Sequence, residues 1–67
     1  MIIAQRIKEL RLEKRYTQKV LAELVYCDQS MIARWEKEEC EPTASAIVNL
    51  SSALECSCDY LLGRSDE

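Results

Sequence analysis

The sequence of 67 residues contains no histidine and no phenylalanine, and it has only one glycine and one proline. Without histidine, the chain lacks the side chain that most often serves as a general acid or base and as a metal ligand. A single glycine argues against a glycine-rich phosphate-binding loop, and so few turn-forming residues argue against an all-β domain. We therefore expect neither an enzyme nor a protein that holds a cofactor or a small-molecule ligand.

Long apolar segments are also missing. No apolar run approaches the roughly 18 residues that mark a membrane-spanning helix, and residues 1–6 lack the basic and then apolar layout of a signal peptide. The sequence therefore predicts a cytoplasmic protein with no membrane partner. A chain this short forms one domain, residues 1–67, and buries only about 60% of the surface that its unfolded chain exposes, so its stability is marginal.

Four cysteines, Cys27, Cys40, Cys56 and Cys58, follow the spacing C-x12-C-x15-C-x-C. Structural zinc sites use close pairs such as C-x2-C or add histidines, and the sequence has neither. Disulfides remain an alternative, but cysteine also packs as a small buried hydrophobic residue. We expect four packing thiols and no metal site.

The charges are unevenly distributed along the chain. Nine basic and twelve acidic side chains give a formal net charge of −3, which is the wrong sign for a general nucleic-acid binder. Residues 1–27 carry six basic and three acidic side chains, whereas residues 38–67 carry Arg64 alone against seven acidic ones. This segregation is compatible with a phosphate-facing surface in the first half and a surface for another partner in the second.

Apolar residues recur at helical spacing along the chain, which predicts an all-α fold of five helices. Thr17, Asp28 and Thr43 stand where N-caps are needed, since their side-chain oxygens accept from free amides at a helix start. Pro42 favours a break before the fourth helix. The predicted helices cover about residues 3–14, 18–25, 29–37, 43–54 and 58–62.

The apolar faces of these helices predict the core. The side chains expected to point inward are Ile3, Ile7, Leu10, Leu21, Ala22, Leu24, Val25, Ile32, Trp35, Ile47, Leu50 and Leu54. Val48 lies beside the apolar stripe formed by Ile47, Leu50 and Leu54, and it is expected to stay partly exposed. Trp35 is expected in the core rather than as a base-stacking surface, and its indole N–H then needs an acceptor or an exposed edge.

Residues 16–37 (YTQKVLAELVYCDQSMIARWEK) predict two short helices joined by a turn of about four residues, which is the layout of a helix-turn-helix. Around it stand, in order, RIKELR (6–11), TQ (17–18), LAE (21–23), Ser30, RWE (34–36), PT (42–43), AL (53–54) and DYLLG (59–63). In these motifs the sequence resembles the XRE family of Cro and lambda-repressor type. The resemblance implies a compact five-helix lambda-repressor-like domain, with the helix-turn-helix at about 17–37 and C-terminal helices at about 43–62.

The resemblance implies that the third helix reads base edges in the major groove of DNA. Gln29, Ser30 and Arg34 match the positions at which the family makes these contacts. Glutamine pairs with adenine and arginine with guanine, and residues 30 and 34 share one helix face because they are one turn apart. Met31 is compatible with contact to a thymine methyl or with packing on a neighbouring helix.

Phosphate contacts are expected around the second helix. The resemblance places Gln18 where the family binds a phosphate at a helix start. Lys19, Lys37 and Arg15 are further candidates on charge alone. Asp28 would repel DNA, and we interpret it as an N-cap.

Two further features follow from the resemblance. It implies an ion pair between Arg11 of the first helix and Glu36 of the third, with a structural role and no DNA contact. The family usually has glycine at four helix ends, where this sequence has Arg15, Tyr26, Glu38 and Glu55. A residue other than glycine in left-handed backbone costs on the order of 1 kcal/mol at each position.

Two functions remain open at this point. The first is a sequence-specific, double-stranded-DNA-binding transcriptional regulator, expected to be a repressor that binds a two-fold symmetric operator as a homodimer through its C-terminal helices. The second is a protein-interaction module, similar to an antitoxin or a regulatory subunit, that uses its acidic C-terminal half and binds DNA only secondarily. The acidic loop of residues 38–41 raises both possibilities, because three carboxylates there would weaken phosphate binding, and a repressor would offset this weakness with operator specificity.

Overall fold

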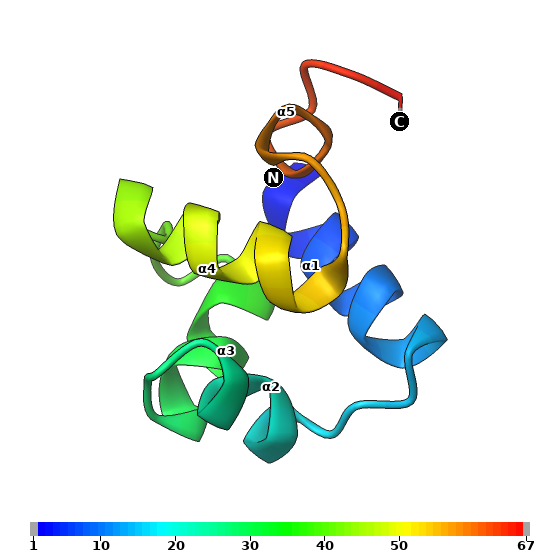
Figure 1. Ribbon diagram of the computed structural model, residues 1–67. Helices are drawn as coiled ribbons and strands as arrows, with labels where there is room; N and C mark the ends of the chain where they lie inside the picture. The colour runs from blue at the N-terminus through cyan, green and yellow to red at the C-terminus, as the bar shows by residue number, and fades with distance from the viewer. Residues whose placement is uncertain (1, 67) are drawn as a thin grey trace.

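The computed structural model describes residues 2–66, and within that range every regular element is a helix. The five helices are α1 (Ile2–Glu13), α2 (Gln18–Leu24), α3 (Gln29–Glu36), α4 (Ala44–Leu54) and α5 (Cys58–Leu61) (Figure 1). The predicted all-α, five-helix architecture is confirmed, with helix ends within about two residues of those expected. None of the described helices has the length and apolar character that crossing a membrane requires.

Side-chain caps fix the starts of three helices. Thr17, Thr43 and Ser57 begin α2, α4 and α5, and each hydroxyl oxygen accepts a hydrogen bond of 2.9–3.2 Å from the backbone amide three residues later. Asp28 takes the N-cap position of α3 in extended backbone, as predicted, but its side chain makes no capping hydrogen bond. That part of the prediction is wrong, and α3 therefore begins without a side-chain cap.

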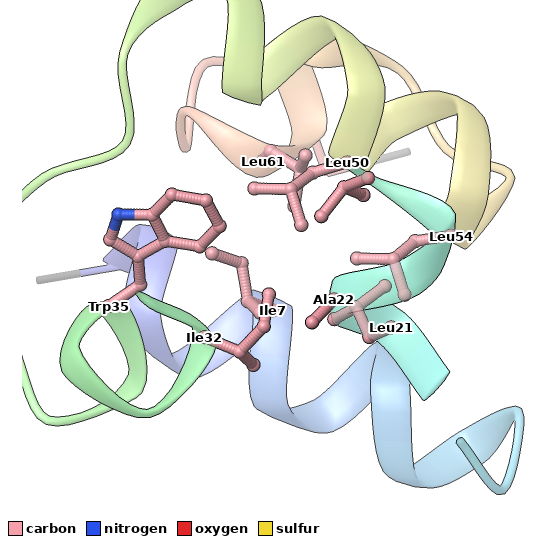
Figure 2. Close-up of a cluster of buried hydrophobic side chains, with 9 residues drawn as sticks. Ile7, Leu21, Ala22, Ile32, Trp35, Leu50, Leu54 and Leu61 are labelled. Carbon is pink, nitrogen blue, oxygen red and sulfur yellow. The ribbon is translucent and has the colours of Figure 1, made fainter. Parts of the chain in front are cut away.

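A cluster of buried aliphatic side chains fills the space between the helices (Figure 2). The largest side chains that are fully buried are Ile7, Leu21, Ile32, Leu50, Leu54 and Leu61. Ala22 is also buried, and its small side chain lets α2 approach its neighbours closely. The described helices thus share one core to which each of them contributes.

The prediction that Leu24 is buried is wrong, because 44% of its surface is exposed. Successive residues of a helix are about 100° apart, so Leu21, Ala22 and Val25 define a buried arc that leaves Leu24 outside it. Ile3 and Leu10 reach the core only partly. Val48 is 57% exposed, as expected from its place beside the α4 stripe.

A buried ion pair joins α1 to α3. Nε and Nη2 of Arg11 lie 2.7 and 3.1 Å from the two carboxylate oxygens of Glu36, which makes the pair bidentate. Only 10% of the Arg11 side chain and 6% of the Glu36 side chain are exposed. Nη1 of Arg11 also donates to the carbonyl oxygen of Tyr16 at 2.9 Å. The ion pair inferred from the resemblance is confirmed, and it also holds the connection that leads into α2.

A second ion pair joins the end of α1 to the end of α4. Nζ of Lys14 lies 3.0 Å from a carboxylate oxygen of Glu55. The hydrogen bond to Glu55 raises the pKa of Lys14 above its ordinary value. This pair is exposed to solvent on the Glu55 side, so it contributes far less to stability than the buried pair does.

The buried pair generates a stability prediction. Glu36→Ala leaves the buried guanidinium of Arg11 without a counter-charge, and we expect a loss of about 3–5 kcal/mol in the free energy of unfolding. In a chain of this length that corresponds to a fall of more than about 12 °C in Tm, or to an unfolded protein. Thermal denaturation followed by circular dichroism measures it.

Two further variants sharpen this test. Glu23→Ala removes an exposed carboxylate from α2 and is expected to leave Tm nearly unchanged. The double variant Arg11→Met/Glu36→Leu removes both charges and is expected to recover most of the loss, because no charge is left buried without a partner. A Tm of Glu36→Ala within a degree of the parent value would show that the pair does not stabilise the fold.

Candidate nucleic-acid interface

Two short helices form one end of the molecule. In Figure 1, α2 and α3 lie at the end opposite α5, with α1 and α4 between them and α5. The connection between α2 and α3 consists of four residues, 25–28, and it turns the chain so that α3 crosses α2. This is the helix-turn-helix arrangement that the sequence predicted for residues 17–37.

The polar side chains of α3 that the sequence singled out are on the surface. Gln29 and Ser30 occupy the first turn of α3 and are exposed. Arg34 is one turn after Ser30, and about half of its side chain is exposed. Its Nε is 4.0 Å from a carboxylate oxygen of Glu39, a long ion pair that leaves the guanidinium accessible. The structure therefore brings these three predicted positions together on an accessible part of α3.

Met31 takes a different place on the same helix. It is half-buried and packs against the central core cluster. Of the two expected contacts of Met31, the structure shows the one with neighbouring parts of the fold. A contact with DNA stays a prediction.

The expected phosphate contacts differ in how accessible they are. Lys19, Lys37 and Arg15 are exposed. Gln18 is half-buried, and its Nε2 donates to a carboxylate oxygen of Glu36 at 3.2 Å. Sequence reasoning missed this bond, which connects the first residue of α2 to the buried ion pair. Gln18 therefore keeps only part of its hydrogen-bonding capacity for a ligand.

Acidic residues flank the same end of the molecule. Glu38, Glu39 and Glu41 are all exposed on the loop between α3 and α4. Glu39 already lies near Arg34. The charge around α3 is therefore mixed, with Arg34 in its last turn and Lys37 at its end, and with carboxylates just beyond that end. Such a surface attracts phosphates weakly and leaves more of the discrimination to direct contacts.

An open cavity of about 260 Å³ lies beside the turn that leads into α3. Its lining is entirely uncharged and consists of Val25, Tyr26, Cys27, Met31, Trp35, Thr43, Ser45, Ala46 and Asn49. Trp35 is buried, and no group of residues 2–66 accepts a hydrogen bond from its Nε1. The expectation that this N–H has an acceptor or an exposed edge is wrong. Figure 2 shows the nitrogen on the edge of the indole that is turned away from Leu50 and Leu54.

The cysteines are free thiols, and each is half-buried. Cys27, Cys40 and Cys56 pack against the core cluster, which confirms the interpretation as packing thiols for these three. Burial raises the pKa of the Cys27 thiol, with a smaller effect of the Asp28 charge, and burial also raises the pKa of Cys56. Among residues 2–66, no group of three or more potential ligands is placed to hold a metal ion.

Comparisons with known proteins place this arrangement among DNA-binding regulators. A family model described as helix-turn-helix matches residues 7–61. Repressor protein C2 of Salmonella phage P22 is 36% identical over 61 residues, which are 91% of this chain and 28% of that protein. The regulator ImmR of Bacillus subtilis (strain 168) is 32% identical over 66 residues, 98% of this chain and 52% of that protein. The chain thus spans about a quarter to a half of the length of these relatives.

Solved structures agree with the sequence comparisons. The P22 c2 repressor in complex with a synthetic operator superposes with a TM-score of 0.91 at 34% identity, covering 97% of this chain and 98% of that one. The N-terminal DNA-binding domain of SinR from Bacillus subtilis gives a TM-score of 0.88 at 31% identity, covering 98% of this chain and 97% of that one. The predicted lambda-repressor-like fold is therefore confirmed.

The backbone at four helix ends is left-handed, at the positions where the resembled family usually has glycine. Arg15, Tyr26, Glu38 and Glu55 have φ angles of 62°, 61°, 62° and 56°. Each lies just beyond the end of a helix, in the order α1 to α4. A side chain in this region costs on the order of 1 kcal/mol relative to glycine.

Tyr26 offers the clearest test of this strain, because its side chain is 86% exposed and loses little packing when removed. Tyr26→Gly is expected to stabilise the protein by about 1 kcal/mol and to raise Tm by about 4–8 °C. Tyr26→Ala removes the same ring but keeps a side chain at positive φ, so it should give no such gain. Equal Tm values for the two variants would contradict a strained turn.

Proposed function

The chain belongs to the XRE-type helix-turn-helix family, and from that membership we propose that it binds specific sequences of double-stranded DNA as a transcriptional repressor. The observation that carries the proposal is the accessible polar face of α3, formed by Gln29, Ser30 and Arg34. It is supported by the likeness of the whole fold to a repressor in complex with an operator. The proposed activity needs no cofactor and no catalytic group, so we propose no enzymatic role. Because the proposed ligand is DNA, we also propose that the protein acts in the cytoplasm.

We propose that α3 enters the major groove of B-form DNA, which is wide enough to admit one helix. The amide of Gln29 then presents one donor and one acceptor to adenine, and the guanidinium of Arg34 presents two donors to guanine. Ser30 lies on the same face as Arg34 and contacts a neighbouring base edge. The depth of α3 in the groove is set by the fold, because Glu36 at its end is fixed by the ion pair to Arg11.

Phosphate contacts position this helix. Lys19 and Lys37 are the exposed cations nearest the two ends of the helix-turn-helix, and Gln18 adds a neutral contact with its remaining hydrogen-bonding capacity. The carboxylates of the loop after α3 oppose these cations. We therefore propose weak binding to random DNA and a large share of the affinity from base contacts at the operator.

A homodimer completes the proposal. One helix-turn-helix covers only a few base pairs, so two copies related by a two-fold axis read half-sites about 34 Å apart. Exposed apolar residues outside the helix-turn-helix supply a contact surface, with Val48 on α4 and Leu62 after α5. Glu55, Asp59 and Asp66 are exposed and belong at its rim, where Arg64 is available as a cross-subunit partner. Glu67, the last acidic residue of the sequence, lies outside the described residues.

The base-contact proposal is tested with operators selected from random duplexes. Arg34→Ala is expected to lower affinity for the selected site by about 1–3 kcal/mol and to lose preference for the base it reads. Gln29→Ala should behave in the same way at another base. Arg34→Lys is the matched variant, because it keeps the charge and loses the two-pronged contact, so specificity falls while the salt dependence stays the same.

Lys19→Ala provides the contrasting phosphate variant. It should weaken binding to all sequences alike and reduce the slope of log affinity against log salt by about one. Full affinity of Arg34→Ala for the selected site would contradict the assignment of α3. A slope near zero on random duplexes, together with no selectable site, would instead favour an interaction module whose acidic half binds another protein.

The dimer is tested separately. We expect a protein that is monomeric at micromolar concentration in sedimentation equilibrium and that assembles on a two-fold operator. Val48→Glu places a charge in the proposed contact surface and should abolish the advantage of a full site over a half-site without changing Tm, because residue 48 is largely exposed. A strict monomer at high concentration that binds a half-site as tightly as a full site would contradict the dimer.

A further inference from the structure

Arg6 connects the first turns of α1 to the C-terminal part of the chain. Its Nη1 donates to the carbonyl oxygens of Tyr60 and, at 2.8 Å, of Ser65. Its guanidinium carbon lies 4.0 Å from the centroid of the Tyr60 ring, and its Nη2 is 3.9 Å from a carboxylate oxygen of Asp66. Only 15% of this side chain is exposed. One arginine thus contacts three residues across more than fifty positions of sequence.

The helix that Arg6 contacts is too short to hold its own orientation. α5 has four residues, and a helix of this length is not stable in isolation. Leu61 anchors it in the core, and the thiol of Cys58 donates to Ser51 of α4 at 3.3 Å. These two contacts attach α5 to the core and to α4. Arg6 adds a contact with Tyr60 within the helix and one with Ser65 beyond its end, which attach this segment to α1 as well.

A close backbone contact reinforces this attachment. Gly63 has a φ of 79°, and a Cβ placed on it would lie 2.6 Å from Cγ2 of Ile2. The backbone of the C-terminal turn therefore packs directly against the first residue of α1. Ile2 and Leu62 flank this contact and both keep exposed apolar surface. The position of Leu62, one of the residues that we assign to the dimer surface, is tied to α1 in this way.

The two arginines of α1 act on opposite ends of the molecule. Arg6 holds α5, and Arg11 holds α3 through Glu36. Arg11 follows Arg6 by five positions of the helix, a rise of about 7.5 Å. α1 is therefore a rigid connection between the proposed dimer surface and the helix that we propose reads DNA, with a polar attachment at each end.

We propose that Arg6 is a positioning residue that sets the separation of the two α3 helices in the dimer, and hence the half-site spacing that the protein accepts. The inference rests on the proposed dimer and deepens it. The molecule is 27 Å long. A rotation of about 10° at the dimer surface therefore shifts its far end by about 5 Å, which exceeds the 3.4 Å rise of one base pair.

The experiment measures affinity for operators whose half-sites are moved apart or together in steps of one base pair, and for a single half-site. The wild-type chain is expected to show one preferred spacing. Arg6→Met keeps the aliphatic stem and loses the guanidinium, and we expect its preference for that spacing to fall by about fivefold or more, at the lower end of coupling between distant sites. Its half-site affinity should stay within about twofold of wild type.

Two further variants complete the design. Lys8→Met removes a positive charge from an exposed position of the same helix and should leave the spacing preference unchanged. Arg6→Lys keeps the charge and an aliphatic stem but loses the planar guanidinium that lies over the Tyr60 ring, so it should relax the spacing preference partly while preserving the fold. Arg6→Lys carries the test if Arg6→Met does not fold.

The outcomes separate this inference from the proposed function. An unchanged spacing profile in both Arg6 variants would overturn the inference alone. A loss that is equal for the half-site and for every full site would also overturn it, because it would show a purely structural role. A wild-type chain that binds selected half-sites without any spacing preference would overturn the inference together with the dimer. A wild-type chain that selects no DNA site would overturn the proposed function itself.

Discussion

The position of α3 depends on one buried, bidentate ion pair. Arg11 and Glu36 connect two helices that are distant in sequence, and the surrounding contacts with Tyr16 and Gln18 bring the start of α2 into the same network. A charge buried to this extent is tolerated only when its partner is held in good geometry. The network therefore fixes the positions of α1, α2 and α3 relative to one another. It thereby also fixes the position of the accessible face of α3.

Most of the fold could be predicted because local patterns and tertiary packing agree. Helical spacing, threonine N-caps and the break at Pro42 all point to the same five helices. The prediction was wrong at Leu24 because periodicity places an apolar face only approximately, and it was wrong for the Trp35 N–H because packing left that group without an acceptor. The contacts of Arg6 could not be predicted, since nothing in a sequence indicates which distant carbonyls an arginine reaches. The base-contact residues follow from the resemblance and remain predictions.

The distribution of charge determines how strongly the proposed interface attracts DNA of any sequence. Cations precede and end the helix-turn-helix, while the following loop and the C-terminal half are acidic. Under the proposed function, such a surface gains little from general attraction to DNA, so the protein would spend less time on random sequence. Selectivity then depends on the geometry of α3 and, in a dimer, on how rigidly two copies of α3 are held apart.

The left-handed residues at four helix ends also affect how much of the protein is unfolded at equilibrium. Four positions at about 1 kcal/mol each raise the unfolded fraction by about a thousandfold relative to a chain with glycine there. Proteases act on that fraction, and a small chain with one core has little further stability to offset it. The strained helix ends therefore enlarge the fraction of the chain that is open to proteolysis.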